Sequence, residues 1–364
     1  REYLTDYSPE FLAQAARTTY GEAFGGKAGY LAPVEGDTYA LELWHGPTCA
    51  FKDYALQLMP KLLVEAKKML GRTETTRILV ATSGDTGKAA LAGYADLDGI
   101  EIEVFYPNDG TSEIQHLQMA TQKGENVQVY AVQGNFDDAQ TGVKKVFADA
   151  DVAAELEKRG IRLSSANSIN WGRLVPQIVY YFYAYFRLAE QGAVEWGKPV
   201  DFCVPTGNFG DILAGYYAKQ MGLPVGRLVC ASNKNNVLTD FLRTGTYDAR
   251  RTFYKTTSPS MDILISSNLE RLLYHVSGSS EKVAGWMQEL CLEWLFRLMQ
   301  DPKRLIPRYM DTNFSFIHYV WKENKLLKKK NQELVHTPSR PKTGMKIAMI
   351  GHKRIPSREG GVEI

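Results

Sequence analysis

Strand-like and helix-like segments alternate along most of this chain, and the alternation predicts an α/β fold with mostly parallel sheets. Short runs rich in valine and isoleucine recur, and each is followed by a polar or glycine-containing loop and then by a helical pattern. The 364 residues are enough for two domains with a sizeable core. We therefore expect sheets covered by helices on both faces.

The first expected element is a helix over residues 7–20, because Ser8 is a suitable N-cap and Pro9 suits the first helical position. A helix over 54–70 follows from apolar residues at close to helical spacing. Further helices are expected at 88–97, 112–123, 137–150, 174–190, from the loop at 205–211 to 221, at 237–244 and at 287–299. Strands are expected at 39–44, 76–81, 102–106, 127–132, 200–204, 227–231 and 345–351.

The composition is that of an ordinary globular protein, with 44% hydrophobic and 23% charged residues. A net charge of +2 is too close to zero to indicate nucleic acid or a membrane surface as a partner, and we expect neither. The 4 cysteines are widely spaced and the 6 histidines form no ligand motif, so we expect no metal and a reducing compartment. The chain begins without methionine, and we expect it to be a fragment.

The segment His45-Gly46-Pro47-Thr48-Cys49-Ala50-Phe51-Lys52-Asp53 is the centre of the functional prediction. A strand leads into it, and a helix begins just after Lys52. The positive end of a helix disfavours an ammonium group, and an uncharged lysine is a nucleophile. Lys52 is therefore the candidate catalytic residue, although a lysine in a loop is more often simply solvated.

A second loop, Thr82-Ser83-Gly84-Asp85-Thr86-Gly87, lies between a strand and a helix. Backbone N–H groups and hydroxyls at such a position suit a small anion such as a carboxylate. The loop is not a P-loop, because Thr82 replaces the first glycine and Ala89 replaces the serine or threonine after Lys88. An ordinary helix-capping loop is the alternative.

Two further loops have features that suit phosphate. Gly207-Asn208-Phe209-Gly210-Asp211 again joins a strand to a helix, and its glycines allow the backbone to approach a phosphate closely. Asn167-Ser168-Ile169-Asn170-Trp171-Gly172-Arg173 combines amide, hydroxyl and guanidinium groups. On its spacing alone, this last segment is more often a loop that carries a surface arginine.

Together these segments closely resemble threonine synthase, a fold-type-II pyridoxal phosphate enzyme, over residues 1 to about 285. The resemblance implies a two-domain architecture like that of the tryptophan synthase β chain. The larger, cofactor-binding domain would comprise 1–70 and 170–285, the smaller one 71–169, and 286–364 would be a divergent segment.

The resemblance also implies site roles. Lys52 would carry pyridoxal 5'-phosphate and move protons, and Asp85 would lie beside the phenolic oxygen of the cofactor. The cofactor phosphate would be held by Gly207, Asn208, Phe209, Gly210 and Asp211. The amino-acid end of the substrate would be held by Ser83, Gly84 and Thr86, and the substrate's own phosphate by Asn167, Ser168 and Arg173.

The implied activity is that of a lyase in threonine biosynthesis, which converts O-phospho-L-homoserine and water to L-threonine and phosphate. By resemblance we expect a cytoplasmic monomer with a small-molecule substrate, and a dimer is the alternative. Another fold-type-II lyase, such as a threonine dehydratase, is the rival enzyme. A non-catalytic threonine-synthase-like protein is the rival outside enzymes.

Two departures from the family pattern weaken the expected activity. Family members carry an additional N-terminal segment, and a later Asp-Pro-His-Thr-Ala-like stretch contacts the pyridine nitrogen. Here Asp301-Pro302 continues with Lys303-Arg304. We expect a chain truncated at both ends with weak or absent activity. The closing stretch from Met345 faintly resembles the start of a GT-B glycosyltransferase, which suggests a fusion or a mis-joined reading frame.

Overall fold

The computed structural model describes residues 3–27, 29–108, 110–134, 136–168, 170–277 and 345–350. The chain forms two compact units, one of residues 1–245, 251–268 and 344–364 and the other of 246–250 and 269–343. All the candidate site residues lie in the first unit. The second unit contains helix α12 (Leu269–Ser277) within its described part. No helix of the described residues is both long and apolar enough to span a bilayer.

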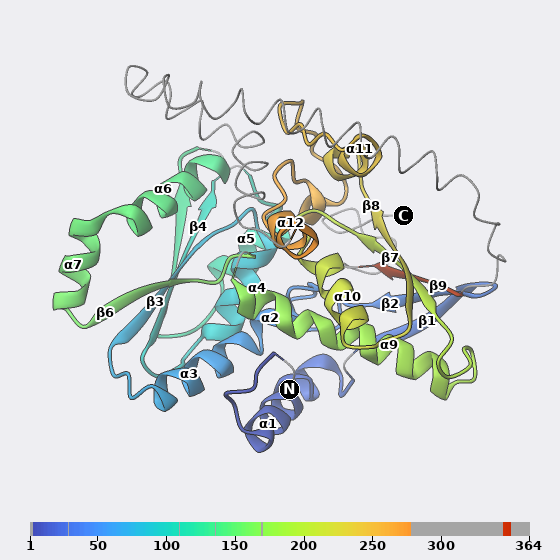
Figure 1. Cartoon of the computed structure of the whole chain (residues 1–364). Coiled ribbons are helices and arrows are strands. Elements are labelled where there is room, and N and C mark those ends of the chain that lie inside the picture. The colour runs from blue at the N-terminus through green and yellow to red at the C-terminus, as the bar shows by residue number, and fades with distance from the viewer. Residues whose placement is uncertain are drawn as a thin grey trace. The chain divides into compact units, whose positions relative to one another are not determined.

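The first unit contains a five-stranded and a four-stranded sheet (Figure 1). The five-stranded sheet has the order β1-β2-β9-β7-β8, with strands β1 (Tyr30–Glu35), β2 (Thr38–Glu42), β9 (Met345–Ile350), β7 (Val200–Pro205) and β8 (Val225–Ala231). Strands β1 and β2 form an antiparallel hairpin, and every other pair in this sheet is parallel. The strand predicted at 345–351 is confirmed, and it lies between β2 and β7.

The four-stranded sheet is entirely parallel, with the order β5-β4-β3-β6. Its strands are β5 (Val127–Val132), β4 (Ile100–Pro107), β3 (Thr75–Ala81) and β6 (Ile161–Ser165). Alternate residues of β3 serve opposite faces: Ile78 and Val80 join one buried cluster, and Leu79 and Ala81 join another. Both faces are therefore covered, as expected for parallel strands, and the predicted α/β class is confirmed.

The helices of the first unit include the sheet-covering elements expected from the sequence. They are α1 (Pro9–Thr19), α2 (Asp53–Leu56), α3 (Met59–Met69), α4 (Asp85–Tyr94), α5 (Glu113–Ala120), α6 (Phe136–Ala148), α7 (Ala150–Lys158), α8 (Trp171–Leu174), α9 (Ile178–Glu190), α10 (Gly210–Gln220) and α11 (Val237–Thr244). The predicted cap of α1 is confirmed, because the Ser8 hydroxyl accepts a hydrogen bond from the Phe11 N–H group.

The single helix predicted over 54–70 is divided into α2 and α3. Pro60 has no N–H group to donate to the carbonyl of Leu56, four residues earlier. That carbonyl instead lies against Gly93 of α4, where a Cβ atom would stand only 2.0 Å from its oxygen. The proline therefore ends α2, and Gly93 allows α4 to pack closely against the end of the lysine-bearing segment.

Several further elements were not predicted, among them β1, α7 and β6. Strand β1 contains Pro33, which weakens a strand pattern but is tolerated at a sheet edge. Helix α7 starts afresh after α6 because the Asp149 carboxylate caps it, accepting hydrogen bonds from two backbone N–H groups. Strand β6 pairs with β3 and brings the segment that follows it to the carboxyl edge of the smaller sheet. The helix expected at 287–299 lies outside the described residues.

Candidate active site

Lys52 immediately precedes α2, at the end of the loop that leaves β2. The residue is 8% exposed, so the ordinary alternative of a solvated lysine is wrong. Burial is the largest effect on the pKa of its amine, and lowers it because charge is disfavoured away from water. Helix α2 has only 4 residues. Burial, and not the helix dipole invoked from the sequence, is therefore the main reason why the neutral amine is favoured.

Asp85, the first residue of α4, is buried, and four polar side chains surround its carboxylate. The amide Nε2 of Gln115 donates to Oδ1 at 2.6 Å, and the Nζ of Lys88 lies 3.2 Å from the same oxygen. The hydroxyl of Ser260 donates to Oδ2, and the Nζ of Lys52 is 3.7 Å from Oδ2. The structure thus brings the predicted residues Lys52 and Asp85 together and adds three residues that the sequence analysis did not assign.

The remainder of the loop before α4 is organised by Thr82. Its hydroxyl accepts hydrogen bonds from the N–H groups of Gly84 and Gly87, at 2.9 and 3.0 Å. Gly84 has φ = 142°, and a Cβ atom there would lie 2.3 Å from Gln115 Oε1, so glycine is required. Ser83 is exposed and Thr86 is half-buried, which leaves both hydroxyls accessible to a ligand.

The loop from Gly207 to Asp211 leads from β7 into α10, with Phe209 in the left-handed conformation at φ = 64°. Within the described part of the chain, the N–H groups of residues 207–210 have no recorded hydrogen-bond acceptor. A Cβ atom on Gly207 would lie 2.9 Å from a side-chain carbon of Ile263. Free N–H groups at a helix N-terminus form an anion-binding arrangement.

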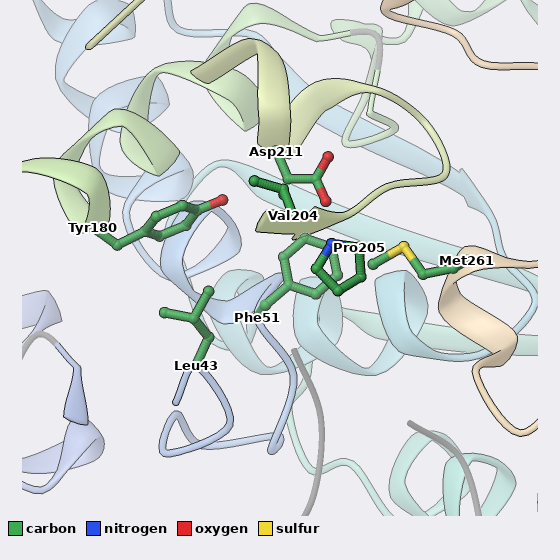
Figure 2. Close-up of a pocket in the computed structure, with 7 residues that line it drawn as sticks. All are labelled: Leu43, Phe51, Tyr180, Val204, Pro205, Asp211 and Met261. Atoms are coloured by element: carbon green, nitrogen blue, oxygen red, sulfur yellow. The ribbon is translucent and has the colours of Figure 1, made fainter. Parts of the chain in front are cut away.

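Asp211 contributes a carboxyl group to a small pocket beside this loop (Figure 2). The pocket is lined by Leu43, Phe51, Tyr180, Val204, Pro205, Asp211 and Met261. Burial raises the pKa of Asp211 to about 7, although hydrogen bonding from the Ile212 N–H group and the charge of Lys52 oppose the shift. With this pKa, Asp211 gains or loses its proton near neutral pH. It lines the same pocket as Phe51, the residue that precedes Lys52.

Arg173, on α8, is 4% exposed, so the alternative of a surface arginine is wrong. Its Nη1 donates to the carbonyl of Ala166 at 2.6 Å, whereas its Nε has no hydrogen-bond partner in the described part of the molecule. Burial lowers the pKa of Arg173 to about 10. No carboxylate of the described residues lies within ion-pair distance of it, and its charge acts on Lys52. A buried guanidinium that has no carboxylate partner is suited to bind an anionic ligand.

The segment Ser266-Ser267-Asn268 links the two predicted phosphate loops, and the sequence analysis missed it. Asn268 donates through Nδ2 to the carbonyl oxygens of Ser168 and Asn208, at 3.1 and 3.2 Å. The hydroxyl groups of Ser267 and Ser168 are 2.9 Å apart. The buried Oδ1 atoms of Asn167 and Asn268 have no partner among the described residues. The density of serine and threonine in 256–268, which ends at Asn268, was the available sequence signal.

A hydrogen-bond network holds the loop that carries Ser260. Asp262 Oδ1 accepts from the Nδ2 groups of Asn233 and Asn235, at 2.8 and 3.0 Å, and from the Thr256 hydroxyl at 2.7 Å. Asn233 and Asn235 lie shortly after the end of β8, at the carboxyl edge of the larger sheet. The network thus joins the loop that carries Ser260 to the segment that follows β8. No group of histidine, cysteine, aspartate or glutamate suited to a metal ion occurs within the residues that the structure describes.

A family model described as pyridoxal-phosphate dependent enzyme matches residues 31–298, most of the chain. The chain belongs to this family. Its cofactor is therefore pyridoxal phosphate, as predicted. The predicted resemblance to threonine synthase, and the fold that the resemblance implied, are also confirmed by the relatives described next.

Human threonine synthase-like 1 is 48% identical over 273 residues, which are 72% of this chain and 36% of that protein. Threonine synthase of Pseudomonas aeruginosa is 46% identical over 267 residues, 73% of this chain and 54% of that protein. The structure of pyridoxal-phosphate-bound threonine synthase from Brucella melitensis aligns with a TM-score of 0.69 and 41% identity, covering 79% of this chain and 60% of that one. The chain thus spans between about a third and three fifths of these relatives.

The residues of the site fit the cofactor of this family. Lys52 is buried with its pKa lowered, which suits covalent attachment of an aldehyde. The free N–H groups of 207–210 suit a phosphate, and Gly207 leaves no space for a Cβ atom. Arg173 is a second, separate cation without a carboxylate partner in the described part of the chain. The site therefore offers more positive charge than the phosphate of the cofactor alone would require.

Proposed function

We propose that this protein is a threonine synthase, which converts O-phospho-L-homoserine and water to L-threonine and phosphate. In this reaction the bond between the γ carbon and the phosphate oxygen breaks, phosphate leaves, and water adds at the β carbon. The proposal includes the predicted setting, a cytoplasmic step of threonine biosynthesis performed by a monomer on a small-molecule substrate.

The observation that carries the proposal is the buried, carboxylate-free guanidinium of Arg173. A substrate with its own phosphate would supply the missing anion, with Asn167 and Ser168 nearby on the same loop. Enzymes of this family that act on serine or threonine have no substrate phosphate to bind. A buried cation without an anionic partner is costly, and the phosphate of the substrate would offset that cost.

Lys52 is the proposed attachment point of the cofactor and the group that moves protons. Bound pyridoxal phosphate supplies an electron sink that stabilises negative charge at the α carbon. The Nζ atom of Lys52, once released by the substrate amine, accepts the α proton and can return it. Its lowered pKa favours the neutral form that this role requires.

The remaining residues orient the substrate and cofactor. Ser83, Gly84 and Thr86 are proposed to hold the substrate carboxylate, because their loop presents accessible hydroxyls at the start of α4. The loop of Gly207, Asn208, Phe209, Gly210 and Asp211 is proposed to hold the cofactor phosphate through its N–H groups. Asp85 remains the proposed neighbour of the phenolic oxygen. Binding at both ends of the substrate directs its α proton toward Lys52.

The decisive experiment compares substrates in the wild type and in Arg173→Met. Purified protein is loaded with pyridoxal phosphate, and phosphate and threonine are measured after addition of O-phospho-L-homoserine. Loss of the guanidinium should remove about 2–5 kcal/mol of substrate binding, at least a 30-fold rise in KM. Arg72→Met is the matched control, because Arg72 pairs with Glu74 on the surface. Lys52→Ala should abolish both products.

The alternatives predict different products. A threonine dehydratase would release ammonia and a keto acid from L-threonine or L-serine, and would be insensitive to the loss of a phosphate-binding arginine. A non-catalytic protein would bind pyridoxal phosphate and O-phospho-L-homoserine, detected as a thermal shift, without product. Keto-acid release by the wild type would contradict the proposed substrate. Binding without product would contradict the proposed turnover and would agree with the weak or absent activity expected from the two departures from the family pattern.

A further inference from the structure

Lys88 is a buried lysine that the proposed function does not use to bind either the cofactor or the substrate. It lies on α4, and its side chain is 2% exposed. Lysine is almost never buried to this extent unless its charge is compensated. The compensating group is Asp85, whose Oδ1 lies 3.2 Å from the Lys88 Nζ. The same carboxylate is the close acidic neighbour of Lys52.

The two lysines do not share Asp85 equally. The Nζ of Lys88 is within hydrogen-bond distance of Oδ1, whereas the Nζ of Lys52 is 3.7 Å from Oδ2, too far for a hydrogen bond. Oδ1 also receives the Gln115 amide, and Oδ2 receives the Ser260 hydroxyl. Asp85 is therefore largely committed to groups other than Lys52.

We propose that Lys88 is a positioning residue: it binds Asp85 and competes with Lys52 for its charge, and so keeps the Lys52 amine uncharged and free to react. The proposal rests on the proposed role of Lys52 as the attachment point of the cofactor. It is independent of which substrate the enzyme uses.

The charges that face Lys52 agree with this role. Burial lowers the pKa of Lys52 most strongly, and the positive charges of Arg173 on α8 and Lys88 on α4 lower it further. Asp85 and Asp211, on α4 and α10, act in the opposite direction. Loss of Lys88 would remove one repelling cation and release Asp85 toward Lys52. Both changes favour the charged, unreactive ammonium.

Asp53, the remaining acid on the lysine-bearing segment, is occupied elsewhere. Its carboxylate accepts hydrogen bonds from the N–H and hydroxyl groups of Thr48, at 2.9 and 2.8 Å, and from the amide of Gln57 at 3.2 Å. It holds the turn that precedes Lys52. Asp85 is thus the carboxylate through which a neighbouring cation can most directly affect Lys52.

The test is the pH dependence of cofactor attachment, which does not require turnover. Apoprotein is mixed with pyridoxal phosphate at a series of pH values, and the rate of growth of the visible absorbance band is measured. Borohydride reduction followed by peptide mass spectrometry verifies that the cofactor is attached to Lys52. For Lys88→Met, the curve of rate against pH should move to higher pH, with a rate about three- to tenfold lower at pH 7.

Two variants serve as controls. Lys88→Arg retains a cation opposite Asp85 and should restore the wild-type curve. Lys158→Met removes a lysine from a pair of the same spacing, Glu155 and Lys158 on α7, whose side chains are 64% and 76% exposed, and should leave the curve unchanged.

Lys88→Gln is included in case the methionine variant does not fold, and it should shift the curve in the same direction. An unchanged curve in either neutral variant would overturn the proposal. If both neutral variants fail to fold while Lys88→Arg folds, Lys88 is a structural residue and the proposal is also wrong. A wild type that attaches the cofactor but releases no phosphate would contradict the proposed function and leave this test intact.

Discussion

Two acid–lysine pairs with the same spacing on helices have very different surroundings. Asp85 and Lys88 on α4 are 3.2 Å apart with side chains 4% and 2% exposed. Glu155 and Lys158 on α7 are 3.8 Å apart with side chains 64% and 76% exposed. Local sequence does not separate them, since both are an acid followed by a lysine three residues later. Water screens the charges of the exposed pair. The charges of the buried pair are not screened in this way, so each must be compensated by neighbouring groups of the protein.

The largest expected difference between the two pairs is in stability. Asp85→Ala should lower the free energy of unfolding of the cofactor-free protein by about 3–5 kcal/mol, because it leaves the buried charge of Lys88 uncompensated. Urea denaturation followed by circular dichroism measures this loss. Glu155→Ala is the matched change on α7, and its loss should be several-fold smaller. Equal losses at the two sites would contradict the comparison.

Burial also changes how a carboxyl responds to pH, and the buried carboxyl of Asp211, which belongs to neither pair, makes this effect measurable. Its pKa of about 7 in the folded protein exceeds the value of about 3.9 expected for an unfolded aspartate. Between these values the folded carboxyl keeps a proton that the unfolded chain has lost. Its contribution to the free energy of unfolding therefore falls as pH rises from about 4 to about 7, by roughly 2–4 kcal/mol, and is level above that range.

Asp211→Asn should remove this pH dependence, because an amide does not titrate. The measurement is the difference in the free energy of unfolding between the variant and the wild type, obtained by urea denaturation at several pH values from about 4.5 to about 8. The variant should gain stability relative to the wild type as pH rises. A difference that stays constant with pH would show that burial does not perturb this carboxyl.

Ser260→Ala removes an uncharged partner of the Asp85 carboxylate and should have an intermediate effect on the free energy of unfolding. Its hydroxyl donates to the Asp85 carboxylate, and a hydrogen bond to a charged group contributes about 1.5 kcal/mol or somewhat more. Thr121→Val is the control, because the Thr121 hydroxyl donates to a neutral carbonyl at an exposed position. If both variants lose the same stability in urea, the charge of Asp85 does not strengthen the bond from Ser260.

The smallest effect is expected for Glu155→Gln. An exposed pair on a helix contributes about 0.2–0.5 kcal/mol, and salt screens it. Thermal denaturation in low and high salt should show a small loss that disappears in high salt. A loss that persists in high salt would mean that Glu155 stabilises α7 through something other than its charge.

Local sequence chemistry was sufficient for much of the fold. The cap at Ser8, the alternation in β3 and the glycine-containing loops before α4 and α10 all depend on residues close in sequence. The division at Pro60 was readable in principle, because proline cannot donate the missing hydrogen bond. Strand β1 was obscured by Pro33, which is tolerated only because the strand lies at a sheet edge.

The site was less accessible to sequence reasoning. Arg173 could not be distinguished from a surface arginine, because its burial depends on packing around α8 rather than on its neighbours in sequence. Ser260 reaches Asp85 across 175 positions of the chain, and Asn268 reaches Ser168 across 100. The serines and threonines of 256–268 were visible in the sequence, but their hydrogen-bond partners were not.

By itself, the sequence determined the α/β class, the lysine segment and the loops that can bind anions, because helix caps, strand patterns and glycine turns are set by adjacent residues. It also carried the family resemblance. Only the tertiary structure decided that Lys52, Lys88, Asp85 and Arg173 are withdrawn from water. The physical reason is that the energy of a charge depends on the solvent and the other charges around it, and distant segments supply both.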